Sequence, residues 1–263
     1  MDSEKNYCLI TGASNGIGKA LAEECTNRKL NLFLVALPES GLEELSKHLA
    51  KINGNDIQCL SIDLTEMDAP KKVYNYAKTN NLIIDKIINN AGVGGFGEMA
   101  DQKESEVDTM IMLNIRATTL LTYYFLNDLK KLPHAYILNI SSFGAFVPIP
   151  KKSLYAATKS YILFFSRALN TELKGTNITV SSVHPSGVAT NPRLKKSMQK
   201  ASMVAKITTL DSSEVAKIAI DGMIKNKKLI VPGIATQFFY IVGLMLPHGI
   251  VLRIIRKVFS KNS

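Results

Sequence analysis

Short apolar runs alternate with amphipathic stretches along most of this chain of 263 residues. The runs rich in Val, Ile and Leu predict strands, and the stretches with apolar positions three to four residues apart predict helices. The predicted strands are Tyr7–Ile10, Asn31–Ala36, Asp56–Ile62, Leu82–Ile88, Ala135–Ile140, Asn177–Val183 and Lys228–Val231. The predicted helices are Ile17–Arg28, Glu39–Ile52, Pro70–Thr79, Glu104–Leu129, Ser153–Leu173 and Ser212–Lys225.

Strands that are apolar along their whole length need cover on both faces, which is typical of a parallel sheet. Because a helix separates successive strands, right-handed crossovers predict an α/β fold. This fold is a doubly wound, Rossmann-type parallel sheet of about seven strands with helices on both faces. No linker interrupts the pattern, so residues 1–233 are predicted to form a single domain, and residues 234–263 are predicted to form an extension of it.

A glycine-rich turn, Thr11-Gly12-Ala13-Ser14-Asn15-Gly16-Ile17-Gly18, joins the first predicted strand to the first predicted helix. Gly12 permits a tight turn, Gly16 lets the main chain approach a pyrophosphate, and Gly18 allows the helix to pack closely on the strand. The amino-terminal end of the helix favours an anion. The turn therefore indicates a dinucleotide-binding site near the start of the domain.

Tyr155 and Lys159 are four residues apart in a predicted helix, so their side chains share one face. A free tyrosine titrates near pH ~10, and a neighbouring cation is expected to lower that pKa. Tyr155 would then exchange a proton with a carbonyl or alcohol oxygen. Ser142 follows the strand 135–140, at the sheet edge where ligands bind, and its hydroxyl can donate to a developing alkoxide. The neighbouring Ser141 is an alternative for this role.

These motifs resemble the short-chain dehydrogenase/reductase family, which has the Gly-x-x-x-Gly-x-Gly spacing. The matching positions are the glycine turn, Asp63, Asn89-Asn90-Ala91-Gly92, Asn114, Ser142, Tyr155-x-x-x-Lys159 and Pro185-Ser186-Gly187-x-x-Thr190. They extend from residue 7 to about residue 232, with Ser186 where the family usually has glycine. The resemblance implies an oxidoreductase that uses NAD(P)(H) to interconvert a ketone and its secondary alcohol by hydride transfer.

The resemblance also implies a role for each matching residue. The expected catalytic residues are Ser142, Tyr155, Lys159 and Asn114, the last of which would hold a water molecule beside the lysine. The expected cofactor-binding residues are Gly12, Ser14, Asn15, Gly16, Ile17, Gly18, Asp63, Leu64, Asn90, Ala91, Gly92, Tyr155, Lys159, Pro185, Gly187, Val188 and Thr190. His184 is expected to be a structural histidine at a strand end. The cysteine spacing matches no metal motif, so no metal is expected.

The end of the second predicted strand, Val35-Ala36-Leu37-Pro38-Glu39, bears on the choice of cofactor. Members of the family that prefer NAD usually have an acidic residue there, and members that prefer NADP often have an arginine. Leu37 occupies the position of that arginine, and no aspartate replaces it. The absence of a carboxylate that would repel a 2′-phosphate favours NADP(H) over NAD(H), although Glu39 lies two residues further along the chain.

Apolar or small side chains surround the expected substrate pocket: Val93, Phe96, Phe143, Ala145, Phe146, Val147 and Ile149. The family has a mobile lid at the segment from Val188 to Lys206, which here contains Met198, Met203 and Val204. These residues predict a hydrophobic ketone or alcohol as the substrate, such as a 3-oxoacyl or steroid-like ketone. The alternative is that several of them are ordinary core residues.

Charge and hydropathy change toward the end of the chain. Residues 1–130 contain 13 Lys and Arg against 18 Asp and Glu, and residues 131–263 contain 19 against 4. Aromatic residues do not interleave with the basic clusters, so no nucleic acid is expected as a partner. Leu229–Leu252 contains no charged residue, and basic residues follow it. For residues 234–261 three roles stay open: a cap over the pocket or a subunit contact, a peripheral membrane contact, and a membrane span.

The remaining sequence features concern location and assembly. Cys8, Cys25 and Cys59 form no closed disulfide set, and the polar N-terminus does not have the features of a signal peptide. These features predict a cytoplasmic protein, with membrane association through the C-terminal segment as an alternative. The family resemblance implies a homodimer or homotetramer. The alternative function is that of a non-catalytic nucleotide-binding protein or a membrane-surface scaffold protein.

Overall fold

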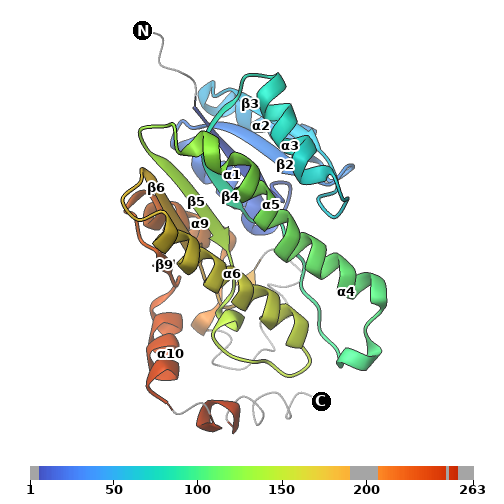
Figure 1. The fold of residues 1–263 in the computed structure, drawn as a ribbon, viewed down its shortest axis with the longest axis vertical. Helices are drawn as coiled ribbons and strands as arrows, with labels where there is room; N and C mark the ends of the chain where they lie inside the picture. The colour runs from blue at the N-terminus through green and yellow to red at the C-terminus, as the bar shows by residue number, and fades with distance from the viewer. Residues whose placement is uncertain (1–5, 190–206, 247–248, 254–263) are drawn as a thin grey trace.

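The computed structural model describes residues 6–189, 207–246 and 249–253. Its centre is a seven-stranded parallel sheet in the order β3-β2-β1-β4-β5-β6-β9 (Figure 1). The strands are β1 (Asn6–Thr11), β2 (Asn31–Ala36), β3 (Ile57–Ser61), β4 (Ile83–Asn89), β5 (Ala135–Ile140), β6 (Ile178–Val183) and β9 (Leu229–Ile230). This sheet confirms the predicted doubly wound parallel architecture.

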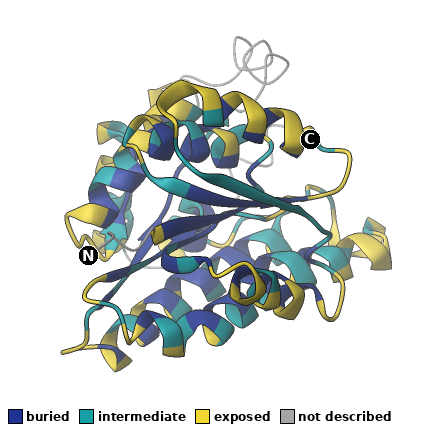
Figure 2. Ribbon diagram, turned by 90° about the horizontal axis from the view of Figure 1, so that it is seen from above, coloured by how far each residue is buried: buried dark blue, intermediate teal, exposed yellow. Residues whose placement is uncertain are grey.

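Two layers of helices enclose the sheet (Figure 2). The helices are α1 (Gly16–Asn27), α2 (Leu42–Asn53), α3 (Ala69–Thr79), α4 (Glu104–Ile111), α5 (Thr118–Leu129), α6 (Ser153–Glu172), α9 (Ser212–Ile224) and α10 (Ile234–Met245). One core cluster joins the sheet to α1, α2 and α9, and a second joins it to α3, α5 and α6. The apolar strands predicted from the sequence are therefore covered on both faces.

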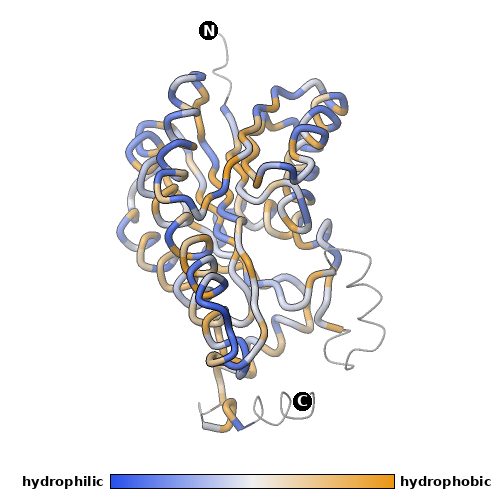
Figure 3. The backbone as a smooth tube through the Cα atoms, turned by 90° about the vertical axis from the view of Figure 1, so that its right-hand side faces the viewer, coloured by the Kyte–Doolittle hydropathy of each residue, from blue (hydrophilic) through white to orange (hydrophobic). Residues whose placement is uncertain are grey.

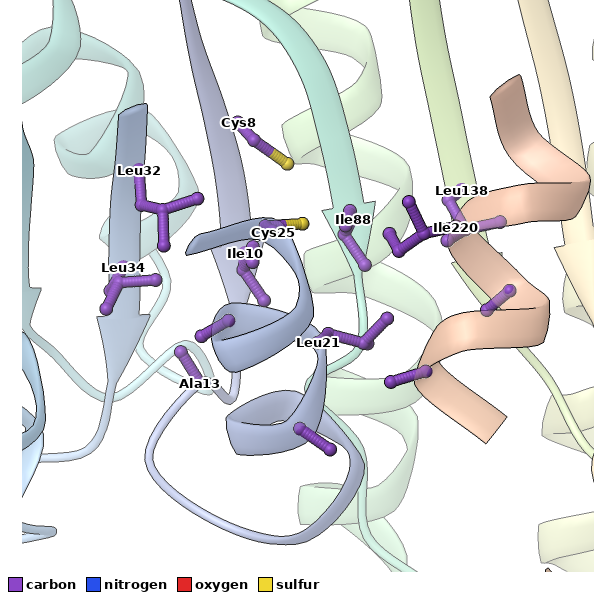
Figure 4. Close-up of a cluster of buried hydrophobic side chains, with 14 of the residues drawn as sticks. Cys8, Ile10, Ala13, Leu21, Cys25, Leu32, Leu34, Ile88, Leu138 and Ile220 are labelled. Atoms are coloured by element: carbon purple, nitrogen blue, oxygen red, sulfur yellow. The ribbon is translucent and has the colours of Figure 1, made fainter. Parts of the chain in front are cut away.

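The first of these clusters shows why the strands are apolar throughout (Figure 4). Leu21 of α1 and Ile220 of α9 pack against Ile88 and Leu138 of the sheet, and all four side chains are fully buried. Each such side chain contributes roughly 2 kcal/mol of hydrophobic stabilisation. Hydrophobic positions gather along the central strands, whereas hydrophilic positions lie mainly on the outer helices (Figure 3).

Two predicted helices differ from the observed ones. The helix predicted from Glu39 begins only at Leu42, because Glu39 and Gly41 have φ angles of 57° and 78° and cannot continue a right-handed helix. The single helix predicted over Glu104–Leu129 contains a π-helical turn at Met112–Ala117. Such a turn inserts an extra residue and is frequent at functional sites.

Two features near the C-terminus were not predicted as elements. A short parallel pair joins β7 (Val188–Ala189) to β8 (Leu210–Asp211). After β9, Gly233 has a φ of 86° and turns the chain into α10. Helix α10 projects from the end of the molecule that lies away from the N-terminus (Figure 1).

Candidate active site

A cavity of about 1700 Å³ lies at the carboxyl edge of the sheet, where the loops after β1, β4, β5 and β6 meet. Ligands bind at this edge in doubly wound sheets because the parallel strands end there together. The predicted site residues that line it are Gly12, Ser14, Asn15, Gly16, Ile17, Gly18, Asp63, Leu64, Asn90, Ala91, Gly92, Ser142, Tyr155, Lys159, Pro185, Gly187 and Val188. One cavity therefore brings together every predicted cofactor residue within the described ranges, and Thr190 lies outside them.

The glycine turn forms one wall of this cavity and is fixed by the loop after β4. Gly12 has a φ of 62°, which side-chain-bearing residues rarely adopt. A Cβ atom on Gly18 would lie 2.0 Å from the Gly12 carbonyl oxygen, so only glycine fits. The Asn90 Nδ2 atom donates to the carbonyl oxygens of Thr11 and Gly12 at 2.9 and 3.1 Å. The turn is thus preshaped for the close approach of a phosphate group.

The end of the cavity near β2 and β3 has few charged groups. The Asp63 Oδ1 atom accepts hydrogen bonds from the main-chain N and the Oγ1 of Thr65, both at 2.8 Å. Ala36, Leu37 and Ser40 line the cavity at the end of β2, and Leu37 is 53% exposed. In this wall the Asp63 carboxylate already accepts two hydrogen bonds, and the apolar side chain of Leu37 is open to a ligand.

Tyr155 and Ser142 meet in the cavity wall. Burial raises the pKa of Tyr155 above its ordinary value, and the nearby Ser142 hydroxyl opposes part of this rise. The Ser142 Oγ atom accepts a hydrogen bond from Gly144 N at 3.1 Å, which holds the serine in the cavity wall. The Tyr155 hydroxyl is therefore protonated at neutral pH. The expected net decrease in the pKa of Tyr155 is therefore wrong, because burial raises the pKa by more than its neighbours lower it.

Lys159 lies beside the Tyr155 ring in the same cavity wall. Its Nζ atom donates to the Ile140 carbonyl oxygen at 3.0 Å and lies 5.9 Å from the centroid of the Tyr155 ring. The side chain is buried, and burial lowers the pKa of Lys159 to about 8. Its interaction with the Ile140 carbonyl holds it beside the tyrosine, without a direct hydrogen bond between Lys159 and the phenol among the described contacts.

Asn114 lies behind this pair, in the π-helical turn. Its side chain accepts from Val93 N and donates to Val93 O, both at 2.9 Å, and donates to Thr158 Oγ1 at 3.0 Å. A Cβ atom on Gly92 would lie 3.0 Å from Asn114 Oδ1 and 3.3 Å from Lys159 Nζ. The amide therefore fixes the loop after β4 and lies close to the lysine, although it is not part of the cavity wall.

His184 is buried at the end of β6, as expected of a structural histidine. Its Nδ1 atom lies 3.2 Å from the Ser142 carbonyl oxygen, and its Nε2 atom lies 2.9 Å from Ser182 Oγ. Burial lowers the pKa of His184 to about 3, so the ring is neutral at physiological pH. The neutral ring holds the main chain of Ser142 in place.

Four of the residues predicted to surround a substrate line the cavity. Val93, Phe143, Val147 and Ile149 line the cavity. Three other predicted residues are outside its wall: Phe96 is 63% exposed, Ala145 is buried, and Phe146 packs against His184. Their neighbours in sequence line the cavity, but each loop can direct only some of its side chains inward. The predicted lid residues Met198, Met203 and Val204 lie outside the described ranges.

Lys152 was not predicted as part of the wall, and the C-terminal segment was predicted to cap the pocket only as one of three open roles. Lys152 lines the cavity with its Nζ atom 5.9 Å from the Tyr155 ring centroid and 6.0 Å from that of Phe96. Its position three residues before Tyr155 was the available signal. The C-terminal segment supplies six further lining residues: Thr236, Phe239, Val242, Gly243, Leu246 and Val251. The uncharged stretch marked this segment, but its apolar positions surround the helix and do not reveal which of them face inward.

Neither a metal centre nor a membrane-spanning helix is found in the described ranges. No group of three or more His, Cys, Asp or Glu side chains there is arranged to hold a metal ion. No helix in the same ranges is long and apolar enough to cross a bilayer.

A family model described as short chain dehydrogenase matches residues 6–201. Among curated proteins, the chain is 29% identical over 214 residues to the very-long-chain 3-oxoacyl-CoA reductase-A of Danio rerio. That alignment covers 78% of this chain and 66% of the relative, so the matched part spans just under two thirds of the relative's length.

Two solved structures have the same fold and similar length. The bulky-bulky ketone specific alcohol dehydrogenase from Comamonas testosteroni matches with a TM-score of 0.78 and 28% identity, over 92% of this chain and 94% of that one. A short-chain dehydrogenase from Sphingobium yanoikuyae in complex with NADPH matches with a TM-score of 0.77 and 28% identity, over 91% and 93%. The glycine turn, the Ser142–Tyr155–Lys159 cluster and the family match over residues 6–201 lead to one conclusion: this chain belongs to the short-chain dehydrogenase family.

Proposed function

We propose that the protein is an NAD(P)(H)-dependent oxidoreductase that interconverts a hydrophobic ketone and its secondary alcohol. The observation that carries this proposal is that Ser142, Tyr155 and Lys159 line one cavity, with Lys159 held by the Ile140 carbonyl oxygen beside the tyrosine ring. A protonated phenol next to a hydroxyl donor is suited to bind a carbonyl oxygen and to supply it with a proton.

The three side chains divide the work on the oxygen atom. Ser142 donates a hydrogen bond to the carbonyl oxygen and stabilises the negative charge that develops there. Tyr155, whose pKa is raised by burial, transfers its hydroxyl proton to that oxygen. The ammonium group of Lys159 stabilises the phenolate that remains. In alcohol oxidation the phenolate accepts the proton and the same contacts act in reverse.

The cavity fits a nicotinamide dinucleotide. At Gly12 and Gly18 a Cβ atom would collide with the main chain or with Asn90, so glycine is needed at both positions. The N-terminus of α1 lies in the same wall of the cavity. Together they would hold the pyrophosphate. Lys159 is placed to donate to a ribose hydroxyl. When bound, the cofactor supplies or accepts the hydride that the protein's own side chains cannot provide.

We propose NADP(H) as the preferred form. No carboxylate lines the cavity at the end of β2, where Ala36, Leu37 and Ser40 lie, so a 2′-phosphate would meet no repulsion there. Glu39 is exposed and is not part of this wall. Fluorescence titration with NADPH and NADH tests the preference, and tighter binding of NADH would overturn it.

The substrate that we propose is a ketone with a sizeable apolar part, such as a 3-oxoacyl or steroid-like ketone. Phe143, Val147 and Ile149 of the loop after β5, together with Phe239 and Val242 of α10, give the cavity an apolar lining. The names of the relatives support this class, because they describe a 3-oxoacyl-CoA reductase and an alcohol dehydrogenase specific for bulky ketones.

The decisive experiment removes only the proposed proton donor. Tyr155→Phe should lower kcat for ketone reduction by about 10²–10⁴-fold while NADPH still binds, because the change deletes one hydroxyl group. The matched control is Tyr161→Phe on the same helix, which deletes a hydroxyl that interacts with Thr119 Oγ1 at 2.8 Å. Oxidation of NADPH is followed by absorbance with a panel of branched, 3-oxoacyl and steroid ketones.

The same panel addresses the alternative of a non-catalytic nucleotide-binding protein or scaffold. Wild-type protein that binds NADPH but reduces none of the ketones, and oxidises none of the alcohols, would favour that alternative. Equal turnover by wild type and Tyr155→Phe would reject the proposed role of the tyrosine while keeping the enzyme class.

A further inference from the structure

Helix α10 has two apolar faces with different surroundings. Its inner face lines the cavity through Phe239, Val242 and Gly243. Its outer side bears large apolar side chains that are mostly exposed: Ile234 at 87%, Phe238 at 62%, Ile241 at 55%, Leu244 at 67% and Met245 at 80%. Positions 234, 238, 241 and 245 follow one another at intervals of four, three and four, so they form one stripe along the helix. We call this stripe the outer face of α10.

The orientation of the helix is fixed by the burial of Thr236, a hydrogen bond of Gln237 and a ring contact of Tyr240. Thr236 is 1% exposed, and the Gln237 Nε2 atom donates to the Val231 carbonyl oxygen at 2.9 Å. The ring of Tyr240 lies 4.5 Å from the ring of Phe146, centroid to centroid. Rotating the helix to bury the outer face would break these contacts and expose the cavity lining. The outer face is therefore a stable apolar surface of the kind that marks an interaction site.

The charges around this surface show what kind of partner fits it. No Asp or Glu follows Asp221 in the sequence, whereas Arg253, Arg256, Lys257 and Lys261 follow the helix. In the described turn after α10, Ile250 and Leu252 are 43% and 40% exposed beside Arg253. An exposed apolar stripe, followed in the sequence by basic residues and by no acidic residue, matches the apolar interior and anionic headgroups of a lipid surface.

A second copy of the chain fits this surface less well. A twofold contact brings the same surface of both copies together. The described Arg253 near α10 would then approach its own copy, and the sequence after Asp221 contains no carboxylate to pair with it. A helix of 12 residues is about 18 Å long, shorter than the roughly 30 Å of a bilayer core, so α10 itself would lie along the surface.

We propose that the outer face of α10 docks the protein on an anionic lipid surface. Docking would place the helix that lines the cavity directly against lipid. If the proposed ketone reduction holds, the hydrophobic substrate enters the cavity from the membrane, past the inner face of α10. This second step rests on the proposed function, whereas the docking step does not.

Cosedimentation of the full chain with vesicles, without cofactor or substrate, tests the docking. Vesicles of phosphatidylcholine mixed with phosphatidylglycerol should bind the wild type more tightly than phosphatidylcholine alone, and added salt should weaken the binding. The double variant Phe238→Ser/Ile241→Ser should bind about tenfold or more weakly, because two apolar side chains no longer enter the lipid. The matched control, Ile52→Ser/Met67→Ser, removes two exposed apolar side chains elsewhere and should bind like the wild type.

A charge variant keeps the test independent of any effect on the fold of α10. Arg253→Gln/Arg256→Gln/Lys257→Gln should lose the preference for phosphatidylglycerol while keeping the apolar outer face. Wild-type protein that binds neither kind of vesicle, or an outer-face variant that binds as tightly as the wild type, would overturn the proposal. So would an outer-face variant that turns a dimer into a monomer in analytical ultracentrifugation with vesicle binding unchanged.

Failure of the docking and failure of the proposed function give different results. The outer-face variant should reduce a water-soluble ketone at the wild-type rate, since Phe238 and Ile241 are not in the cavity wall. Tyr155→Phe, in turn, should bind vesicles like the wild type. Loss of vesicle binding with full ketone reduction is the signature of the docking surface alone.

Discussion

The rings of Phe146 and Tyr240 lie 4.5 Å apart between centroids, and this contact joins the loop after β5 to α10. Phe146 also packs on His184 at 4.6 Å, and His184 holds the main-chain oxygen of Ser142. A continuous set of contacts therefore connects the helix that lines the cavity to the serine beside Tyr155. A displacement of α10 is therefore expected to displace Ser142 as well.

Replacing Tyr240 should reveal this link. Tyr240→Ala removes the ring contact, so we expect a loss of about 1–2 kcal/mol in the free energy of unfolding. The KM for a bulky ketone should rise several-fold because α10 no longer holds its inner face against the cavity. Tyr240→Phe keeps the ring and serves as the control in both measurements. An alanine variant with wild-type KM would show that α10 is held in place by its other contacts alone.

The glycine turn allows a sharper prediction. In Gly18→Ala the new Cβ atom would lie 2.0 Å from the Gly12 carbonyl oxygen and 2.5 Å from Asn90 Nδ2, so the turn must shift. We expect NADPH binding, measured by fluorescence titration, to weaken at least tenfold, together with lower thermal stability. The control is Gly243→Ala in α10, where a Cβ atom meets nothing within 4 Å. There alanine should raise stability by up to about 1 kcal/mol.

Much of this site could be predicted because its geometry follows from chain order. A glycine turn after β1, a serine after β5 and a Tyr–Lys pair on the next helix must all lie at one edge of a parallel sheet. The hydrophobic pattern fixes that sheet, since strands buried on both faces are apolar at every position. Chain order therefore placed Ser142, Tyr155 and Lys159 at this edge without knowledge of any distance, with Ser141 as the alternative to Ser142.

The parts that were missed depend on side-chain direction in irregular segments. The π-helical turn that contains Asn114 changes the helical period over six residues only, which leaves the apolar pattern almost unaltered. In the loop 143–149 the sequence does not show that Phe146 turns toward His184 while Val147 faces the cavity. Helix α10 is apolar all round, so its inner and outer faces appear only when the neighbouring contacts are known.

The pKa of His184 makes stability depend on pH. In the folded protein the ring stays neutral until about pH 3, whereas in the unfolded chain it takes up a proton below about pH 6.5. Between these values the unfolded state binds more protons, so stability falls as the pH falls. Relative to His184→Gln, the wild type should lose up to about 1.4 kcal/mol per pH unit in this range, measured by urea unfolding. Parallel pH curves for the two proteins would contradict the assignment.

The buried charge of Lys159 should lower the free energy of unfolding of the wild type. Its pKa of about 8 lies below the value near 10.5 of an unfolded chain, so the folded state disfavours its charge at neutral pH by roughly 3 kcal/mol. Lys159→Met removes that charge but also the hydrogen bond to Ile140, so we expect a net gain of about 1–2 kcal/mol at pH 7. Reduction of ketones should nevertheless fall by about 10²-fold or more, since no cation remains to stabilise the phenolate of Tyr155.

The pH dependence of the free energy of unfolding shows whether Lys159→Met is more stable because a buried charge is removed or because packing improves. Between pH 8 and 10.5 the folded wild type has released the Lys159 proton while the unfolded chain still holds it, so wild-type stability rises with pH. The advantage of Lys159→Met should therefore shrink across that range and be largest below pH 8. Lys19→Met, at an exposed position on α1, is the control and should change the free energy of unfolding by less than about 0.5 kcal/mol at every pH. A Lys159→Met variant that is less stable than the wild type at pH 7 would mean that the lysine contributes more to the fold through its hydrogen bond than its burial costs.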